Sequence, residues 1–375
     1  MVIGLPKEIK NSEYRVSITP GGVEVLTLAG HTVLVEVGAG VQSGYPDSDY
    51  IDAGAEISNS AERIFAEAEL VVKVKEPQPS EIKQLRRGQT LFTFFHFAAS
   101  KELTLAVKDS GCIAIAYETV TMADGTLPLL TPMSEVAGRL AVQQGARFLE
   151  KINGGSGILI GGVPGVAPAN VVVLGGGVVG TQAATIAAGM GASVTVVDIS
   201  LERLRYLGEI MPANVRTIIS SSFNIRKLLP QADLVISGVL LPGSHAPCLV
   251  TREMISGMKK GSVIVDVAID QGGSMATSKP TSHQDPVYSV DGVLHYCVTN
   301  MPGIVPATST QALTNATFPY VFKLASMGCR EALLSDSSLS AGANMVLGDV
   351  TCENVAKAFN LPYKKVEDAM KSLKT

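Results

Sequence analysis

The sequence of 375 residues contains no tryptophan, and only 5% of its residues are aromatic. It also lacks an excess of basic residues: 30 Lys and Arg stand against 34 Asp and Glu, which gives a net charge of −4. Without a basic stripe, nucleic acid is not expected as a partner. Gly, Ala and Val are plentiful instead, as is typical of closely packed α/β layers, and the length is sufficient for two domains.

Motifs for metal binding, disulfides and targeting are missing as well. The five cysteines form no C-x-x-C pair, and the five histidines show no H-E-x-x-H spacing. Charges and Pro6 interrupt Met1–Lys10 before an apolar signal-peptide core forms. The most apolar stretch, 171–197, contains glycines, threonines and Gln182, which favours a buried strand and helix over a membrane span. We therefore expect a cytoplasmic protein with reduced thiols, no metal and no membrane contact.

The same apolar stretch is the most informative part of the sequence. The run Val171–Leu174 leads into glycines at 175, 176, 177 and 180, and an Ala- and Ile-rich segment, 181–190, follows. A second apolar run, 193–197, ends at Asp198. Strand, glycine turn, helix, strand and terminal acid, in this order, predict the first unit of a dinucleotide-binding fold.

Each residue type in this stretch has a chemical reason. Gly175 permits the tight turn, Gly177 lets the backbone approach a pyrophosphate, and Gly180 lets the helix pack close to the strand. The helix N-terminus offers free N–H groups to the phosphates. Asp198 accepts hydrogen bonds from ribose hydroxyls and repels a 2′-phosphate, which favours NAD over NADP. The alternative, a glycine-rich turn without a ligand, does not explain the flanking elements.

Alternating strands and helices on both sides of this stretch predict an α/β fold with two Rossmann-like domains, parallel sheets and an active site in the interdomain cleft. A substrate domain is expected at 1–130 plus 306–375, and is therefore discontinuous; an NAD-binding domain is expected at 131–305. A long helix over 134–152 connects the two sheets. Extended segments are expected at 288–290 and 297–300, and a helix at 306–327 with a kink or break at Pro319. Further helices are expected around 350–359 and 366–373.

Polar side chains stand where predicted strands end, the place where ligands bind in open α/β sheets. Lys75 ends the strand that begins at Leu70, and His96 ends the strand 91–95, so both lie at one edge of one sheet. Taken singly, Lys75 is explained as a solvated lysine and His96 as a structural histidine. Asp270 follows a buried strand of the second domain, but also fits a turn before glycines. Position alone does not single out Arg15.

Several segments in the same order resemble the alanine dehydrogenase / nicotinamide nucleotide transhydrogenase alpha-subunit family. Besides the glycine turn, they read GLPKEIK at 4–10 with Arg15, KVKEP at 73–77, FFHFAA at 94–99, MSEVAGR at 133–139, GGVPGV at 161–166, DQGG at 270–273 and HYCVTNMPG at 295–303. The matches cover nearly the whole chain and resemble alanine dehydrogenases in particular.

The resemblance implies a role for each matching residue. His96 would be the catalytic acid/base and Asp270 a second catalytic group, whereas Arg15 and Lys75 would bind the substrate. A family arginine that contacts the cofactor is Lys279 here, which keeps the charge but lacks the planar fork. The residues implied to contact NAD are Ser134, Gly175, Gly177, Val178, Val179, Gly180, Asp198, Arg203, Ser220, Val239, Leu240, Val267, Ala268, Ile269, Asp270, Lys279, Val298, Thr299, Asn300 and Met301.

The resemblance also implies a function: reversible, NAD-dependent oxidation of L-alanine to pyruvate and ammonia by a homohexamer. Two alternatives stay open from the residues. One is the NAD(H)-binding subunit of a nicotinamide nucleotide transhydrogenase, which would need a membrane partner. The other is a protein that binds NAD without catalysis, because the fold by itself does not establish an activity.

Overall fold

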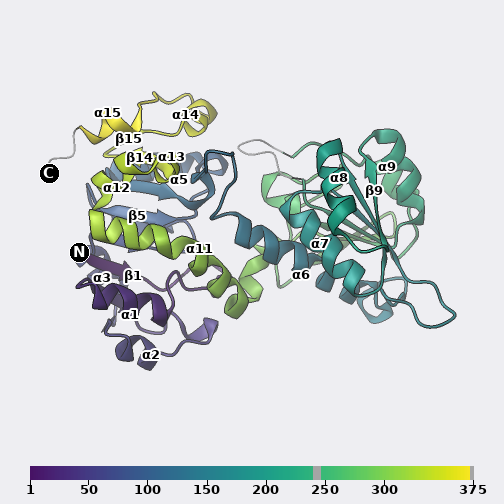
Figure 1. The fold of residues 1–375 in the computed structure, drawn as a ribbon, viewed down its shortest axis with the longest axis horizontal. Coiled ribbons are helices and arrows are strands. Elements are labelled where there is room, and N and C mark those ends of the chain that lie inside the picture. Colours follow the sequence, from purple (N-terminus) through teal and green to yellow (C-terminus); the bar gives the residue numbers. More distant parts are fainter. Residues whose placement is uncertain (240–245, 372–375) are drawn as a thin grey trace. The chain divides into compact units, whose positions relative to one another are not determined.

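The structure, a computed structural model, describes residues 1–239 and 246–371 and divides into two compact units (Figure 1). Unit 1 consists of Met1–Met133 with Gly303–Thr375, and unit 2 of Ser134–Pro302. The sequence placed these divisions after residues 130 and 305. No helix among the described residues is long and apolar enough to cross a bilayer.

Unit 1 is built on an eight-stranded sheet in the order β15-β14-β6-β5-β4-β1-β2-β3. All pairs from β6 to β3 are parallel, whereas β14 pairs antiparallel with both β6 and β15. The elements are β1 (Val2–Leu5), α1 (Pro20–Leu28), β2 (Thr32–Glu36), η1 (Val41–Ser43), α2 (Asp47–Asp52), β3 (Glu56–Ser58), α3 (Ala61–Glu67), β4 (Leu70–Val72), α4 (Pro79–Ile82), β5 (Thr90–Thr93), η2 (Phe97–Ala99), α5 (Lys101–Ser110), β6 (Ile113–Ala116), η3 (Tyr117–Thr119), α11 (Pro306–Met327), α12 (Cys329–Ser335), α13 (Ser337–Gly342), β14 (Ala343–Val346), β15 (Asp349–Val350), α14 (Glu353–Phe359) and α15 (Val366–Met370).

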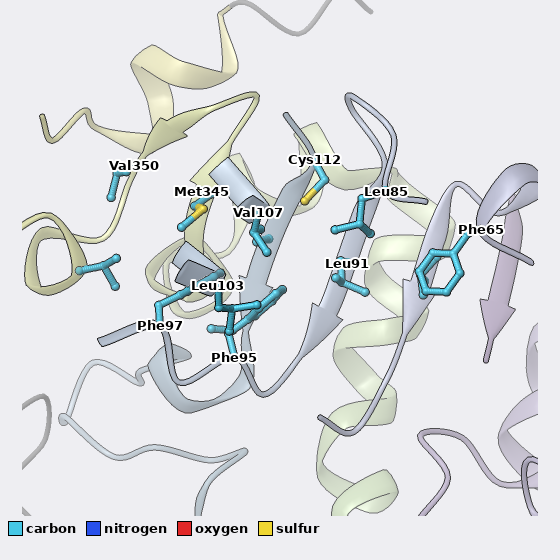
Figure 2. Packing of buried hydrophobic residues seen from close by; sticks show 14 of the residues in the cluster. Phe65, Leu85, Leu91, Phe95, Phe97, Leu103, Val107, Cys112, Met345 and Val350 are labelled. Atoms are coloured by element: carbon cyan, nitrogen blue, oxygen red, sulfur yellow. The ribbon is translucent and has the colours of Figure 1, made fainter. Parts of the chain in front are cut away.

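The core of this unit forms because its central strands are apolar on both faces. Every residue of β4, β5 and β6 is buried, as expected for parallel strands that are covered by helices on both sides. Figure 2 shows one part of this core, in which Phe95, Phe97 and Leu103 pack beneath the strands. The buried strands place their carboxyl ends side by side, at the edge of the sheet where the polar residues follow.

Unit 2 is built on a seven-stranded sheet in the order β12-β13-β11-β10-β7-β8-β9. All its strand pairs are parallel except β12 with β13. The elements are η4 (Lys151–Asn153), β7 (Asn170–Leu174), α7 (Val178–Gly189), β8 (Ser193–Asp198), α8 (Leu201–Ile210), β9 (Val215–Ile219), α9 (Ser222–Leu228), η5 (Leu229–Gln231), β10 (Leu234–Ser237), α10 (Arg252–Ser256), β11 (Val263–Asp266), η6 (Val267–Gln271), β12 (Val287–Val290), β13 (Val293–Tyr296) and η7 (Met301–Ile304). The prediction of an α/β fold with two Rossmann-like domains and mainly parallel sheets is confirmed.

Three element predictions need correction. The connecting helix α6 spans Thr131–Leu149, so it begins and ends three residues earlier than expected. The last strand of unit 2 is β13, at 293–296. Of residues 297–300, Val298 forms an isolated parallel bridge with Thr281, and Asn300 turns the chain with a φ of 57°. Val350, expected in a helix, lies in β15, which pairs with β14.

Helix α11 has no break at Pro319, one of the two outcomes expected there, because it continues from Pro306 to Met327. A proline inside a helix removes one backbone hydrogen bond. The buried face of α11, which includes Leu313, Val321 and Leu324, offsets that loss, since most helix stability in proteins comes from the packing of such a face.

Candidate active site

Three neighbouring parallel strands of unit 1 are each followed by a polar side chain. Lys75 follows β4, His96 follows β5 and Glu118 follows β6 within η3. Because β4, β5 and β6 pair in this order, their carboxyl ends meet at one edge of the sheet. The structure thus brings Lys75 and His96 together at the edge where the sequence placed them, and adds Glu118.

The backbone of Lys75 is held on both sides. Its N–H donates to Glu8 Oε1 at 3.3 Å, and its carbonyl accepts from Thr93 Oγ1 at 2.9 Å. The neighbouring Val74 N–H also donates to Glu8 Oε1, at 2.6 Å. The Lys75 Nζ lies 6.0 Å from the centroid of the Phe94 ring, within the range of a cation–π contact. These contacts fix the backbone of Lys75 and place its ammonium group beside the Phe94 ring.

A buried ion triad lies directly behind Lys75. Lys73 is fully buried, and its Nζ is 3.1 Å from Glu8 Oε2 and 2.8 Å from Glu81 Oε1. Burial alone lowers the pKa of Lys73, but the two carboxylates outweigh it and hold that pKa above its ordinary value. Lys73 therefore remains a cation that fixes Glu8, and Glu8 in turn fixes the Lys75 backbone.

Arg15 is buried in the loop after β1 and is oriented by a neighbouring acid. Its Nε donates to Glu13 Oε1 at 2.6 Å, and its Nη2 donates to Glu13 Oε2 at 2.5 Å, a bidentate pair. Its Nη1 lies 2.9 Å from Met133 Sδ. The side of the guanidinium formed by Nε and Nη2 is thus bound by Glu13, which sets the plane of the group.

His96 has a backbone conformation that side-chain-bearing residues rarely adopt. Its φ and ψ are 51° and 42°, in the left-handed region. Its ring stacks on Phe94 at 5.8 Å with an interplanar angle of 4°. Its N–H donates to Glu118 Oε1 at 2.6 Å.

The protonation of His96 depends on its surroundings. Partial desolvation of the ring disfavours the cation and, with the positive charges of Lys75, Lys10 and Arg15, lowers the pKa of His96 to about 3. The residue itself is exposed at the surface of unit 1, so a small molecule can reach it. At neutral pH, His96 is accordingly an accessible, neutral imidazole that can accept a proton.

The glycine turn of unit 2 has the geometry that a bound pyrophosphate requires. Gly175 has a φ of 92°, which side chains disfavour. A Cβ on Gly180 would lie 1.7 Å from the carbonyl oxygen of Gly175, so only glycine fits. A Cβ on Gly177 would meet no atom within 4 Å, which leaves that space for a ligand, and the N-terminus of α7 has no side-chain cap. These residues fit a dinucleotide phosphate at a helix N-terminus.

Asp198 and Arg203 both form hydrogen bonds with the glycine turn. The Asp198 carboxylate, at the end of β8, accepts from Gly176 N at 2.6 Å and from Ser200 N at 2.8 Å. Arg203 donates to Gly176 O at 2.6 Å and to Thr181 Oγ1 at 2.7 Å. The acid therefore stands beside the turn at the position where a ribose is expected.

The other residues implied to contact NAD fall into three groups. Val239 lies next to the turn, since its Cγ2 would be 3.1 Å from a Cβ on Gly175, and Ser220 pairs with Asp198 through the backbone at 2.8 Å. Residues 267–270 lie in η6 after β11, and 298–301 follow β13, both at strand ends of the same sheet. Ser134 lies in α6, and Leu240 is outside the described residues.

Lys279 is placed away from the glycine turn. Its N–H donates to Tyr288 Oη at 2.7 Å on the edge strand β12, which β13, β11 and β10 separate from β7. It lines a pocket of about 360 Å³ together with Arg252, Thr277 and Asp291. The structure does not bring Lys279 together with Gly175 and Asp198.

Sequence reasoning missed the acids that orient the polar side chains: Glu8, Glu13 and Glu118. The strand-end rule that selected Lys75 and His96 applies equally to Glu118, because it follows the next strand of the row. Glu8 had no such indication, since Lys73 and Lys75 become its neighbours only in the folded chain. Glu13 lies only two residues from Arg15, but neither position follows a strand end. Among the described residues, no group of three or more His, Cys, Asp or Glu is placed to hold a metal ion.

Comparisons with known proteins match the whole chain to one family. The model described as "Alanine dehydrogenase/PNT, N-terminal domain" matches residues 4–137, and "Alanine dehydrogenase/PNT, C-terminal domain" matches residues 141–353. An alanine dehydrogenase from Methanococcus maripaludis is 53% identical over 371 residues, which are 99% of this chain and 100% of the relative. One from Halomonas elongata is 53% identical over 97% of this chain and 98% of the relative.

Solved structures give the same result. A structure titled L-alanine dehydrogenase is 51% identical, with a TM-score of 0.93, and covers 96% of this chain and 99% of its own. A transhydrogenase from Sinorhizobium meliloti is 26% identical, with a TM-score of 0.78, and covers 94% of this chain and 99% of its own. The identity is about twice as high to the dehydrogenase as to the transhydrogenase. The chain belongs to the alanine dehydrogenase/PNT family, and within it the dehydrogenases are the more similar branch.

Proposed function

We propose that this protein catalyses the reversible reaction of L-alanine, NAD and water to pyruvate, ammonium, NADH and a proton. The observation that carries the proposal is that one chain contains both a glycine turn shaped for a dinucleotide and a strand-end cluster of Arg15, Lys75 and His96. Unit 1 would then bind the substrate and unit 2 the NAD. The similarity to dehydrogenases over the full length supports this choice over the transhydrogenase alternative.

The cationic side chains of unit 1 suit an α-amino acid. Arg15 would bind the substrate carboxylate beside its contacts with Glu13, because a planar guanidinium matches a carboxylate. Lys75 would bind the oxygen or nitrogen at the reacting carbon, from a position fixed by Glu8 and Thr93. Bound NAD would supply the acceptor for the hydride that leaves Cα.

His96 would manage the proton of the attacking water. As a neutral imidazole it accepts that proton when water adds to the imine carbon, and it returns a proton when ammonia leaves. The bound carboxylate of the substrate would compensate the positive charges of Lys75, Lys10 and Arg15, which moves the pKa of His96 back toward neutrality. Asp270, in η6 of unit 2, would be the second catalytic group.

The residues of unit 2 would hold NAD through its phosphates and ribose. The turn at Gly175, Gly177 and Gly180 and the first residues of α7, Val178 and Val179, would bind the pyrophosphate, and Asp198 the adenosine ribose. Lys279 would contact the cofactor through its positive charge, without the planar fork of an arginine. By resemblance we also propose that the protein is a cytoplasmic homohexamer. Light scattering on the purified protein tests the number of subunits.

Purified protein mixed with L-alanine and NAD is expected to generate NADH, and mixed with pyruvate, ammonium and NADH to consume it. No turnover in either direction by folded protein that binds NADH would refute the proposal. His96→Ala is expected to lose turnover while it binds NADH as the wild type does. Equal loss of turnover and of NADH binding in that variant would contradict the role given to His96.

A further inference from the structure

The left-handed backbone conformation of His96 needs an explanation in the contacts that surround it. Left-handed backbone is unfavourable for a residue that carries a Cβ, and it persists only where surrounding contacts impose it. Histidine, like asparagine and aspartate, is found there more often than most residues, but the conformation is uncommon even so. Some neighbouring group must hold the chain in this form.

The core fixes the residues on either side of His96. Phe95 and Phe97 are buried, and their rings stack at 4.4 Å with an interplanar angle of 14° (Figure 2). Phe94 and His96 stack on each other separately. The two buried rings anchor the chain before and after His96, but they offer no acceptor to its backbone N–H.

Glu118 provides that acceptor. Its Oε1 receives the N–H of His96 at 2.6 Å and the N–H of Phe95 at 3.2 Å, so two successive backbone donors converge on one carboxylate. Its Oε2 lies 3.3 Å from the same Phe95 N–H. Burial raises the pKa of the Glu118 carboxyl, and the N–H groups of His96 and Phe95 oppose that rise because they stabilise its ionised form. Hydrogen bonds to an ionised acceptor are shorter and about twice as strong as neutral ones. The residue comes from η3, which directly follows the strand paired with β5.

We propose that Glu118 is a positioning residue for His96: its carboxylate binds two backbone N–H groups and thereby holds His96 in the left-handed conformation that places the imidazole beside Phe94 and Lys75. The inference rests on the proposed function, in which His96 transfers protons. Glu118 touches no reacting atom and acts through the backbone of His96.

Three substitutions of Glu118 separate the effect of its hydrogen-bond contacts from the effect of its charge. Glu118→Gln keeps an acceptor oxygen at the same reach but removes the charge, and is expected to lower kcat roughly tenfold. Glu118→Asp keeps the charge but withdraws it by one methylene, and Glu118→Ala removes both; these are expected to lower kcat by up to about 100-fold, the effect of a misplacement near 1 Å. The KM for pyruvate should change much less than kcat, because Arg15 and Lys75 stay in place.

The pH profile gives a readout that a purely structural role would not change. The charged groups facing His96 are Lys75, Lys10, Arg15 and Glu118 itself. When the ring leaves its desolvated setting and the three cations, the pKa of His96 rises toward the ordinary value near 6.5. The acid limb of the kcat/KM profile should therefore shift to higher pH in Glu118→Ala.

Asp336 offers a matched control in the same unit. Its Oδ1 also accepts two successive backbone N–H groups, from Ser338 at 3.0 Å and Leu339 at 3.1 Å, at the start of α13. Asp336→Asn is expected to lower the melting temperature while kcat, KM and the pH profile stay at wild-type values. A loss of kcat in this control equal to that in Glu118→Gln would overturn the inference, because the loss would then reflect general destabilisation.

Two further results would overturn it. One is an activity of Glu118→Asp equal to or above that of Glu118→Gln, which would make charge rather than contact the cause. The other is a crystal structure of Glu118→Ala in which His96 keeps its left-handed φ. The structural result stands even if the wild type fails to oxidise alanine, so failure of this inference and failure of the proposed function are distinguishable.

Discussion

Three glycines around helix α7 provide a sharp test of how the turn works, because each has a different environment. Gly180→Ala places a Cβ 1.7 Å from Gly175 O, Gly177→Ala places one in open space, and Gly189→Ala places one in open space at the far end of the helix. All three substitutions add the same methyl group. We expect them to have three different outcomes.

The expected changes in stability and in NADH affinity follow from the surroundings of each glycine. At Gly180 the turn must open by the 1.3 Å between 1.7 Å and the 3.0 Å limit for real contacts, and such overpacking costs about 1–3 kcal/mol. At Gly189 the methyl reduces the freedom of the unfolded chain and stabilises by about 0.5 kcal/mol. Gly177 is the N-cap, with a φ of −66° that alanine adopts, so its loss of stability is about 0.5 kcal/mol. NADH affinity should instead fall at least tenfold in Gly177→Ala, since the methyl occupies the expected phosphate position.

Urea unfolding of the ligand-free protein and NADH fluorescence titration measure the two effects separately. A tenfold loss of affinity would remove about 1.4 kcal/mol of the stabilisation by NADH. Gly189→Ala is the control for both measurements and should bind NADH normally. Wild-type NADH affinity in Gly177→Ala, or destabilisation of that variant as large as in Gly180→Ala, would refute the assignment of this space to the ligand.

Three other predictions concern charged groups. Lys73→Met leaves two buried carboxylates without their cation and should lower the free energy of unfolding in urea by about 3–5 kcal/mol. Arg63→Met breaks an exposed ion pair and should change that free energy far less; similar losses in the two variants would contradict this. Although burial raises the pKa of Asp336, hydrogen bonds with Lys323, Ser338 and Leu339 hold it at about 2, so its contribution to stability is complete above about pH 4 and disappears as the pH falls toward 2. In Asp336→Asn, the urea midpoint should depend less on pH in that window than it does in the wild type. An equal pH dependence of the two midpoints would count against the prediction. Arg15→Lys should raise the KM for pyruvate more than tenfold at unchanged NADH affinity, because lysine lacks the planar fork; steady-state kinetics with equal KM values would show that Arg15 does not bind the carboxylate.

The cofactor half of the candidate site was predictable because its information is local. The strand, the turn, the helix and the acid lie within residues 170–198, and each follows from short-range rules for glycine, apolar runs and helix ends. The strand-end rule likewise led to Lys75 and His96. The same rule also indicated Glu118, which the sequence analysis did not single out.

The strands near the end of the chain belong to the part of the fold that local sequence patterns do not determine. Residues 343–346 are buried on both faces, but the sequence does not state that they add to the first sheet beside β6, antiparallel to it. Proline at 319 carries a local preference to end a helix, and the burial of α11 overrides it. In both cases contacts distant in the sequence decided the local structure.

By itself the sequence determined two α/β domains with parallel sheets, a dinucleotide turn and the side chains at the strand ends, because these depend on residue type and spacing. Only the tertiary structure decided how those side chains are held. Glu118 is 22 residues from His96, and Glu8 is 65 residues from Lys73, yet both acids are within hydrogen-bond distance of their partners. Such pairings depend on which strands lie next to each other, and so they become visible only when the sheet has formed.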